Sequence, residues 1–232
     1  MNEQNVPTRG KPVSDPRARI AAGAQSLRDA AYEAIKHRII TCTFRPGEYL
    51  NEAFVSASLG FGRTPVHQAI DRLMLEGMVD VMPRKGVIVK PVSLDEIMQI
   101  VDVRLINECH GMRLAAERAE PDEIKHLCDI LARAGQWVEV RNTEQLMLLD
   151  REFHNVLARA SKNHVLADTL SKLHDRSLRF WFISLNRPGH HAHVHAQHEA
   201  ILAAIRDHDA DGADAAMRGH IEEFRNNLTR NI

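Results

Sequence analysis

The segment LGFGRTPVHQAIDRLMLEG, residues 59–77, decides the fold of the first part of the chain. The glycines before Arg63 permit a tight bend, and apolar residues then recur at helical spacing. We expect Thr64 to cap this helix and Pro65 to occupy its first position, where no backbone donor is needed. Gly77 suits the left-handed position that ends a helix. The segment therefore predicts the turn and second helix of a helix-turn-helix.

Polar side chains occupy the part of this helix that the apolar stripe leaves open. Near a helix N-terminus, such groups can hydrogen-bond phosphates and base edges of DNA. We therefore interpret the segment as a DNA-recognition helix. The expected DNA contacts on it are Arg63, Thr64, His67, Gln68 and Arg72.

The residues on both sides of this segment predict the rest of a winged helix. Polar residues 1–25 have little periodic apolar content and are expected to form a flexible arm. A turn containing Arg84, Lys85 and Gly86 joins two expected strands, and such a basic tip can approach the phosphate backbone or the minor groove. The expected elements are helices over 26–41 and 52–59 and strands over 78–82 and 87–89, within a DNA-binding domain of residues 26–92.

From residue 93 onward the pattern predicts helices only. Ser93 and Glu96 have the spacing of a capping box, and Pro121 suits the first position of the next helix. Short breaks divide residues 93–232 into six expected helices, which predicts an antiparallel bundle. The predicted fold class is mostly α, with a winged helix-turn-helix and small β-hairpin followed by a six-helix bundle.

Charge and cysteine content limit the class of protein. Residues 1–90 hold 13 Lys and Arg against 9 Asp and Glu, whereas the rest holds 17 against 22. A basic first part suits binding to a polyanion, although solvated faces without a partner would give the same asymmetry. No apolar run long enough for a membrane span and no secretory signal occur, so no membrane partner is expected. Three widely spaced cysteines suit reduced thiols in a cytoplasmic protein.

Four residues of the bundle have the pattern of a metal site. Asp150 and His154 lie four apart on one helix, while His198 and His220 adjoin apolar residues on two others. An acid and imidazoles that point into a core are costly unless they are paired or bound to metal. Three imidazoles and one carboxylate suit a divalent Zn, Ni, Mn, Fe or Co ion. Because the chain has 14 histidines, a polar surface is the alternative.

Arg104 lies among apolar residues of the first bundle helix, where a guanidinium could bind an anion bidentately. The alternative is a salt bridge with Glu108, four residues later. No motif of a hydrolase, phosphate-binding loop or redox dithiol occurs, so an enzyme is not expected. Two rival functions stay open: a metal-dependent enzyme with an accessory winged helix, and a DNA-binding structural protein without a ligand.

Short motifs in both parts of the chain fit one protein family. They are Arg45-Pro46-Gly47-Glu48, Leu59-Gly60-x-x-Arg63-Thr64-Pro65-Val66, Asp150-x-x-x-His154 and His198-x-x-Ile201. Through these motifs the chain resembles the GntR family of bacterial transcription regulators, in the FadR branch with an all-helical FCD effector domain. Its six bundle helices resemble the VanR-like subgroup.

The resemblance implies a homodimer that binds double-stranded operator DNA and responds to a small carboxylate effector. It further implies a repressor that the effector releases, with a metal that orients the effector and does not catalyse a reaction. The effector is expected to contact Arg104 and His195. The metal ligands implied by the resemblance are Asp150, His154, His198 and His220.

This chain departs from the family pattern at the start of the recognition helix. Gly62 stands where the family usually has Ser, and His67-Gln68 stands where it usually has Arg-Glu. A hydroxyl and an arginine that could contact DNA are therefore replaced by a glycine and a pH-dependent imidazole. We expect Arg63 to contribute more of the recognition, and the operator sequence to differ from the common one.

Overall fold

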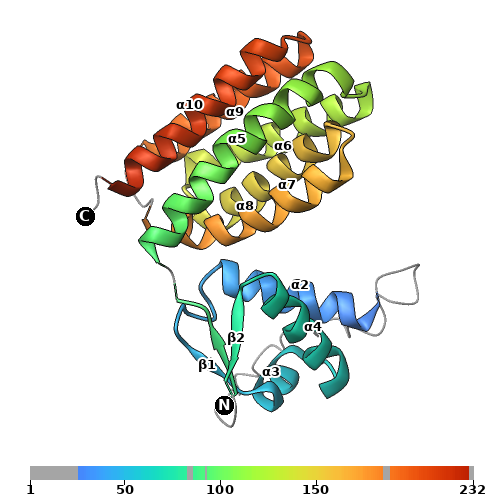
Figure 1. Ribbon diagram of the computed structural model, residues 1–232, viewed down its shortest axis with the longest axis vertical. Coiled ribbons are helices and arrows are strands. Elements are labelled where there is room, and N and C mark those ends of the chain that lie inside the picture. The colour runs from blue at the N-terminus through green and yellow to red at the C-terminus, as the bar shows by residue number, and fades with distance from the viewer. Residues whose placement is uncertain (1–25, 83–85, 92, 185–188, 230–232) are drawn as a thin grey trace, which may run out of the picture.

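The computed structural model describes residues 26–82, 86–91, 93–184 and 189–229. These residues form nine helices and three short strands, arranged as a winged-helix unit next to a larger helical bundle (Figure 1). The predicted fold class is confirmed. The expected arm of residues 1–25 and the wing-tip residues Arg84 and Lys85 lie outside the described residues.

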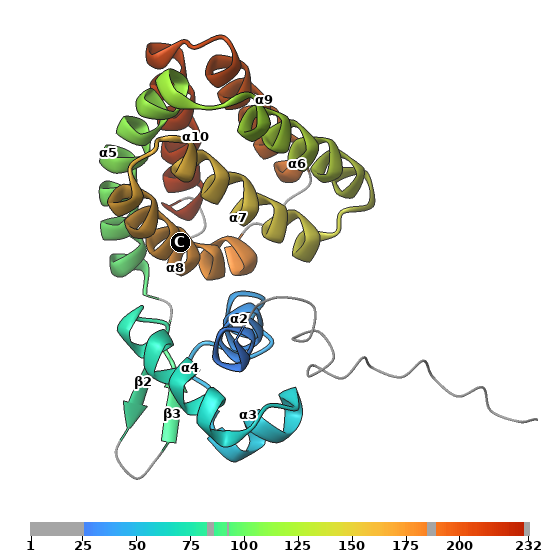
Figure 2. The ribbon, with the colours of Figure 1, turned by 90° about the vertical axis from the view of Figure 1, so that its right-hand side faces the viewer.

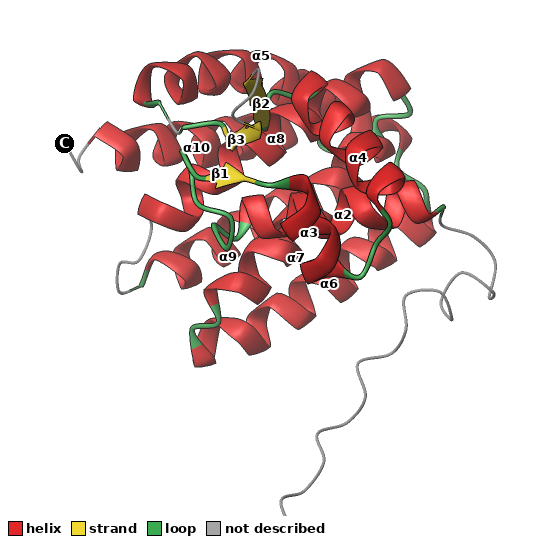
Figure 3. Ribbon diagram, turned by 90° about the horizontal axis from the view of Figure 1, so that it is seen from below, coloured by secondary structure: helices red, strands yellow, loops and turns green. Residues whose placement is uncertain are grey.

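The winged-helix unit contains three helices and one antiparallel sheet whose strand order is β1-β3-β2 (Figure 3). β2 and β3 form the predicted hairpin, and β1 is an additional strand of two residues that the sequence pattern did not indicate. Gly86 has a φ of +97°, and a Cβ there would lie 3.1 Å from the Leu50 carbonyl oxygen, so glycine fits this position best. The elements are α2 (Leu27–Ile40), β1 (Tyr49–Leu50), α3 (Glu52–Leu59), α4 (Arg63–Leu75), β2 (Val79–Met82) and β3 (Gly86–Val89).

Helix α4 begins two residues earlier than the prediction. Gly62 is its N-cap and makes no side-chain capping bond, so the predicted capping role of Thr64 is wrong. Pro65 is consequently the third helical residue, a position tolerated because the first-turn N–H groups lack helical partners in any case. Gly77 has a φ of +71° directly after the helix, as predicted. The apolar face of α4 is buried and packs mainly against α2.

The bundle consists of the six predicted helices. Ser93 caps the first by accepting a hydrogen bond from the Glu96 amide, but the Glu96 carboxylate pairs with Arg176, so the structure shows only this half of the expected capping box. Pro121 is the first residue of the second helix, as predicted. The elements are α5 (Leu94–Arg118), α6 (Pro121–Val140), α7 (Thr143–Ala160), α8 (His164–Ser184), α9 (His190–Arg206) and α10 (Ala210–Thr229).

The helices of the bundle enclose a core that is continuous with that of the winged helix. α5 packs along α10, and α7 lies between α6 and α8 (Figure 2). The end of the bundle formed by α7 and α8 faces α2, so that α2 and α8 are in contact (Figures 1 and 2). No described helix has both the length and the apolar character that crossing a lipid bilayer requires.

Candidate metal centre and DNA-binding surface

The four residues singled out as metal ligands converge inside the bundle. Asp150 and His154 come from α7, His198 from α9 and His220 from α10, and each is buried. Each can offer one ligand atom such that all four atoms lie within 4.8 Å of one another. Helical spacing explains the convergence, because the i and i+4 side chains of α7 share a face.

Hydrogen bonds from neighbouring side chains orient two of the imidazoles. His154 donates from Nδ1 to Glu108 Oε2 over 3.1 Å, and His220 donates from Nδ1 to Gln197 Oε1 over 2.9 Å. A donor at Nδ1 leaves the Nε2 lone pair available for a metal. Glu108 and Gln197 therefore orient two of the candidate ligands.

The donor set fits a divalent cation. Nε2 of His154 and Nε2 of His198 are buried and have no hydrogen-bond partner among the described residues. His198 Nε2 lies 3.5 Å from Asp150 Oδ1, which suits two ligands of one ion. A buried polar atom without a partner costs about 1–3 kcal/mol, and a cation between these atoms would remove that cost. Zn, Ni, Co, Fe and Mn all accept this combination of nitrogen and oxygen ligands.

The protonation states also suit metal binding. Burial lowers the pKa of His198 to about 3 and that of His220 well below its ordinary value. Burial alone would raise the pKa of Asp150, but the hydrogen bond from His174 and the adjacent imidazoles lower it below its ordinary value. At neutral pH the site thus offers two neutral imidazoles and an ionised carboxylate, the forms that bind metals.

His174 was not among the predicted site residues, and Glu108 had no predicted role at the metal. His174 donates from Nε2 to Asp150 Oδ2 over 3.0 Å, so it holds the oxygen next to the one that faces His198. Together with His154, these two residues also form a compact ligand set. Arg104 Nε lies 2.5 Å from Glu108 Oε1 and already supplies a positive charge there, which disfavours a second cation.

A signal for His174 was present in the sequence. Leu170 and Leu178 lie four residues before and after it, and both are buried, so His174 lies on the inward stripe of α8. The same spacing had suggested the Arg104–Glu108 salt bridge as an alternative, and the structure forms that pair.

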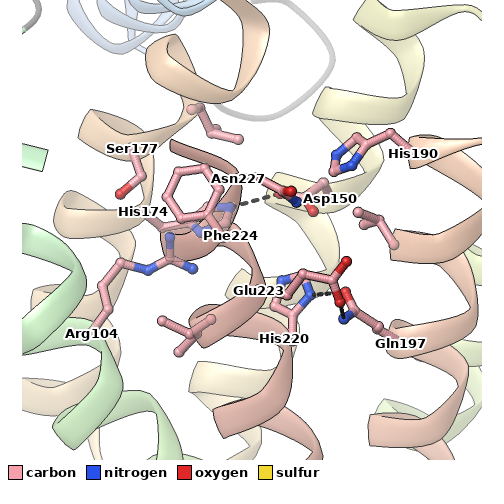
Figure 4. A pocket seen from close by; sticks show the side chains of 13 residues that line it. Arg104, Asp150, His174, Ser177, His190, Gln197, His220, Glu223, Phe224 and Asn227 are labelled. Carbon is pink, nitrogen blue, oxygen red and sulfur yellow. Dashed lines mark hydrogen bonds and ion pairs between the residues drawn. The ribbon is translucent and has the colours of Figure 1, made fainter. Parts of the chain in front are cut away.

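A pocket lined by two of the four candidate ligands, Asp150 and His220, contains about 470 Å³ of space, part of it open to solvent. Figure 4 shows Arg104 extending from α5 beside His174 and Phe224, across the pocket from Gln197. The structure does not place His195 in this pocket. His195 lines a second, largely apolar pocket of about 350 Å³ between α6, α7 and α9, which also reaches Asp150 and His198.

All five predicted DNA contacts on α4 are exposed, and Arg63, Thr64, His67 and Gln68 lie in its first half. Gly86 at the start of β3 is exposed as well. His67 Nδ1 lies 3.1 Å from Glu52 Oε1, and this hydrogen bond with the nearby carboxylates raises the pKa of His67.

The fifth predicted contact on α4, Arg72, is held by its own domain. Its guanidinium carbon lies 3.6 Å from the centroid of the Tyr32 ring on α2, and its Nε donates to Glu76 Oε1 over 3.2 Å. These contacts direct the guanidinium of Arg72 towards α2, away from the N-terminal end of α4 that carries the other four residues.

Comparisons with known proteins agree with both units. Residues 27–89 match the bacterial regulatory proteins of the gntR family, and residues 99–223 match the FCD domain. The Nta operon transcriptional regulator of Aminobacter aminovorans is 32% identical over 183 residues, which cover 78% of this chain and 84% of that protein. The HTH-type transcriptional repressor RspR of Escherichia coli K12 is 24% identical over 200 residues, which cover 86% of this chain and 88% of that protein.

Solved structures show the same fold. E. coli McbR/YncC superposes with a TM-score of 0.81 at 22% identity, over 90% of this chain and 99% of that one. A GntR-type transcriptional regulator from Rhodococcus sp. RHA1, described as putative, superposes with a TM-score of 0.75 at 18% identity, over 90% of this chain and 100% of that one. The matched families and relatives are transcription regulators and not enzymes. The chain belongs to the GntR family of bacterial transcription regulators and combines a gntR winged helix with an FCD domain.

Proposed function

We propose that this DNA-binding regulator is a ligand-responsive repressor whose bundle binds one divalent metal and a small carboxylate. The observation that carries the proposal is the pair of buried, unpartnered imidazole nitrogens of His154 and His198, beside Asp150 and a pocket. A metal held by four protein ligands keeps further positions open when it prefers six. The carboxylate would occupy those positions from the side of the pocket.

The polar groups of this pocket support a carboxylate ligand. Arg104, which also pairs with Glu108, supplies a cation at the pocket wall, and Ser177, Gln197 and Asn227 supply neutral hydrogen-bonding groups. The carboxylate of Glu223 lines the pocket too, but it is bound by His193 and Gln197. Leu178, Val194, Ile221 and Phe224 provide an apolar wall. A compact acid with a short apolar part and hydroxyl or amide groups fits this lining. In this proposal His195 contacts only a ligand that extends into the second pocket.

The DNA-binding part of the proposal follows from exposure and family. The recognition helix α4 presents Arg63, Thr64, His67 and Gln68 to solvent, and a winged helix inserts such a helix into the major groove. The wing residues Arg84, Lys85 and Gly86 would contact the backbone or the minor groove. Two copies would bind the half-sites of a near-palindromic operator.

A homodimer formed through the bundle would place two winged helices on one operator. α5 carries Val103 and Ile106 on its surface with 43% and 73% exposure. Apolar side chains this exposed on a central helix are typical of an oligomer interface. Sedimentation of the full chain with Ile106→Asp, and with Val165→Asp on α8 (78% exposed) as a control, would test this face.

The experiment for ligand response uses the full chain with Zn2+ and a panel of small carboxylates. A ligand raises the melting temperature by mass action and, for a repressor, lowers operator affinity. Acids that act only when Zn2+ is present support the proposal. If no acid changes either quantity while Zn2+ binds, the effector part is rejected and the metal part remains; turnover of an acid would favour the enzyme alternative.

Arg63→Ala is expected to weaken operator binding by about 1–3 kcal/mol, because the exposed guanidinium at the start of α4 can bind guanine bidentately. Fluorescence anisotropy at one fixed salt concentration measures the loss. Arg133→Ala, an exposed arginine of the bundle, serves as the control and should bind as wild type does. Equal affinity of Arg63→Ala and wild type would remove Arg63 from the interface.

Operator affinity is expected to fall as pH rises through the raised pKa of His67, above the ordinary value of 6.5. The imidazolium form attracts phosphate, so binding is stronger at low pH, and deprotonation removes one positive charge from the interface. Titration from pH 6 to 8.5 with wild type and His67→Gln checks this, with Gln68→Ala as a control that keeps the imidazole. The pH dependence should disappear in His67→Gln, together with about one unit of salt slope in the acidic range. An unchanged pH profile would contradict the prediction.

A further inference from the structure

Charged side chains of alternating sign form a continuous row between the recognition helix and the bundle. Arg72 Nε lies 3.2 Å from Glu76 Oε1, and Lys36 Nζ lies 3.2 Å from Glu76 Oε2. Lys36 also pairs with Asp175, and Arg151 Nε lies 2.5 Å from the other oxygen of Asp175. The row, in spatial order, is Arg72, Glu76, Lys36, Asp175, Arg151 and Glu33, whose Oε2 lies 3.6 Å from Arg151 Nη1.

The central part of this row is buried where α2 meets α8. The side chains of Lys36 and Asp175 are 4% and 2% exposed, and that of Glu76 is 8% exposed. Each unit has its own neutral pair, Lys36 with Glu76 and Arg151 with Asp175. The Lys36–Asp175 contact is therefore the fully buried ion pair between the two units, and the more exposed pairs Glu33–Arg151 and His37–Glu144 also join them. Inside a protein such a bond is sensitive to geometry, because a displaced charge loses its partner without regaining water.

The bundle end of the row lies one residue from the candidate metal centre on both helices. Arg151 follows Asp150 on α7, and Asp175 follows His174 on α8. Neighbouring residues of a helix point about 100° apart, so each helix has one of these residues facing the cavity and the next facing α2. Asp150 and His174 pair on the inside over 3.0 Å, and Arg151 and Asp175 pair on the outside.

We propose that Asp175 and Lys36 transmit the state of the metal centre to the winged helix. The inference rests on the proposed function, since it assumes that an ion binds Asp150. An ion on Asp150 fixes the carboxylate that His174 holds, and this fixes α7 against α8. The outer pair Arg151–Asp175 is then fixed in position. Through its contacts with Asp175 and Glu76, Lys36 fixes α2 and the end of α4 relative to this pair.

Lys36→Met removes the buried ion pair between the two units while leaving the other charges with partners. Asp175 keeps Arg151, and Glu76 keeps Arg72 and the Tyr32 hydroxyl, which lies 2.7 Å from Glu76 Oε2. Methionine fills the volume of the buried lysine stem. Asp175→Asn breaks the same bond from the bundle side, and Asp168→Asn, an exposed position of α8, is the matched control.

The test is amide hydrogen exchange of the full chain, chelated and with excess Zn2+ as the only added ligand. In wild type and Asp168→Asn, Zn2+ should slow exchange in α7 and α9 and also in α2, by on the order of 5- to 150-fold if the coupling is of ordinary size. In Lys36→Met and Asp175→Asn the slowing should persist in α7 and α9 but vanish in α2.

Two other outcomes overturn the proposal. One rejects only the transmission, and the other also rejects the metal centre. Suppose that Zn2+ slows amide exchange in α7 and α9 of every protein tested. If exchange in α2 then never responds to Zn2+, or responds in Lys36→Met as much as in wild type, only the transmission is rejected. If Zn2+ slows no segment of the wild-type bundle, the metal centre itself is rejected and the transmission with it. Should one variant fail to fold, the other decides, because the two break one contact from opposite sides.

Discussion

Joint replacement of His198 and His220 by alanine is expected to abolish stoichiometric metal in the purified protein. The two imidazoles come from α9 and α10, so their loss leaves only the α7 residues Asp150 and His154. One acid and one imidazole rarely hold a divalent ion against buffer, whereas four ligands in a preformed cage do. Elemental analysis of the protein after dialysis measures the ratio of metal to chain.

The same replacement should remove the thermal response to Zn2+. At a concentration of 100 times Kd, a ligand stabilises the folded state by about 2.7 kcal/mol. For a domain of this size, each kcal/mol raises Tm by about 2–4 °C, so wild type should gain roughly 5–11 °C. The double variant should gain nothing.

A matched pair of surface histidines provides the control. His126 and His193 have side chains that are 50% and 53% exposed, and neither belongs to the buried cluster. His126→Ala with His193→Ala should keep both the metal ratio and the thermal gain. A metal ratio equal to wild type in His198→Ala with His220→Ala would reject the buried centre.

Periodicity within single helices predicted that the candidate ligands face inward, and the resemblance to the GntR family implied that they bind a metal. Asp150 and His154 are a helical turn apart, and His198 and His220 each adjoin a buried apolar stripe, so one-dimensional patterns place all four inward. The fold class followed for the same reason, since each bundle helix has its own pattern and its own break. The spacing of residues along one helix does not depend on how the neighbouring helices pack against it.

Contacts between distant segments were not predictable in this way. Arg72 has the spacing of a DNA contact on α4, yet its guanidinium stacks on Tyr32, a residue of α2 that no pattern within α4 reveals. Lys36 and Asp175 meet although they belong to different units. β1 has only two residues and forms because β3 lies beside it, so no alternation could indicate it.

Arg104→Met is expected to destabilise the chain by about 3–5 kcal/mol, because it leaves the buried carboxylate of Glu108 without its cation. The side chains of Arg104 and Glu108 are 5% and 4% exposed, so water cannot replace the lost partner. Urea unfolding followed by circular dichroism measures the change. Arg133→Met breaks an exposed pair with Glu152 and should cost at most about 1 kcal/mol.

A second variant separates the two roles that Arg104 could have. In Arg104→Met with Glu108→Leu, both charges leave the core together, so most of the stability should return. His154 would still lose its hydrogen-bond acceptor Glu108, and this should weaken Zn2+ binding by about 10–100-fold even in the stable protein. Recovered stability with weakened metal binding would show that Arg104 neutralises Glu108 and that Glu108 orients His154 for the metal. If Arg104→Met alone unfolds like wild type, the guanidinium is not needed by Glu108 and is free to bind the carboxylate effector directly.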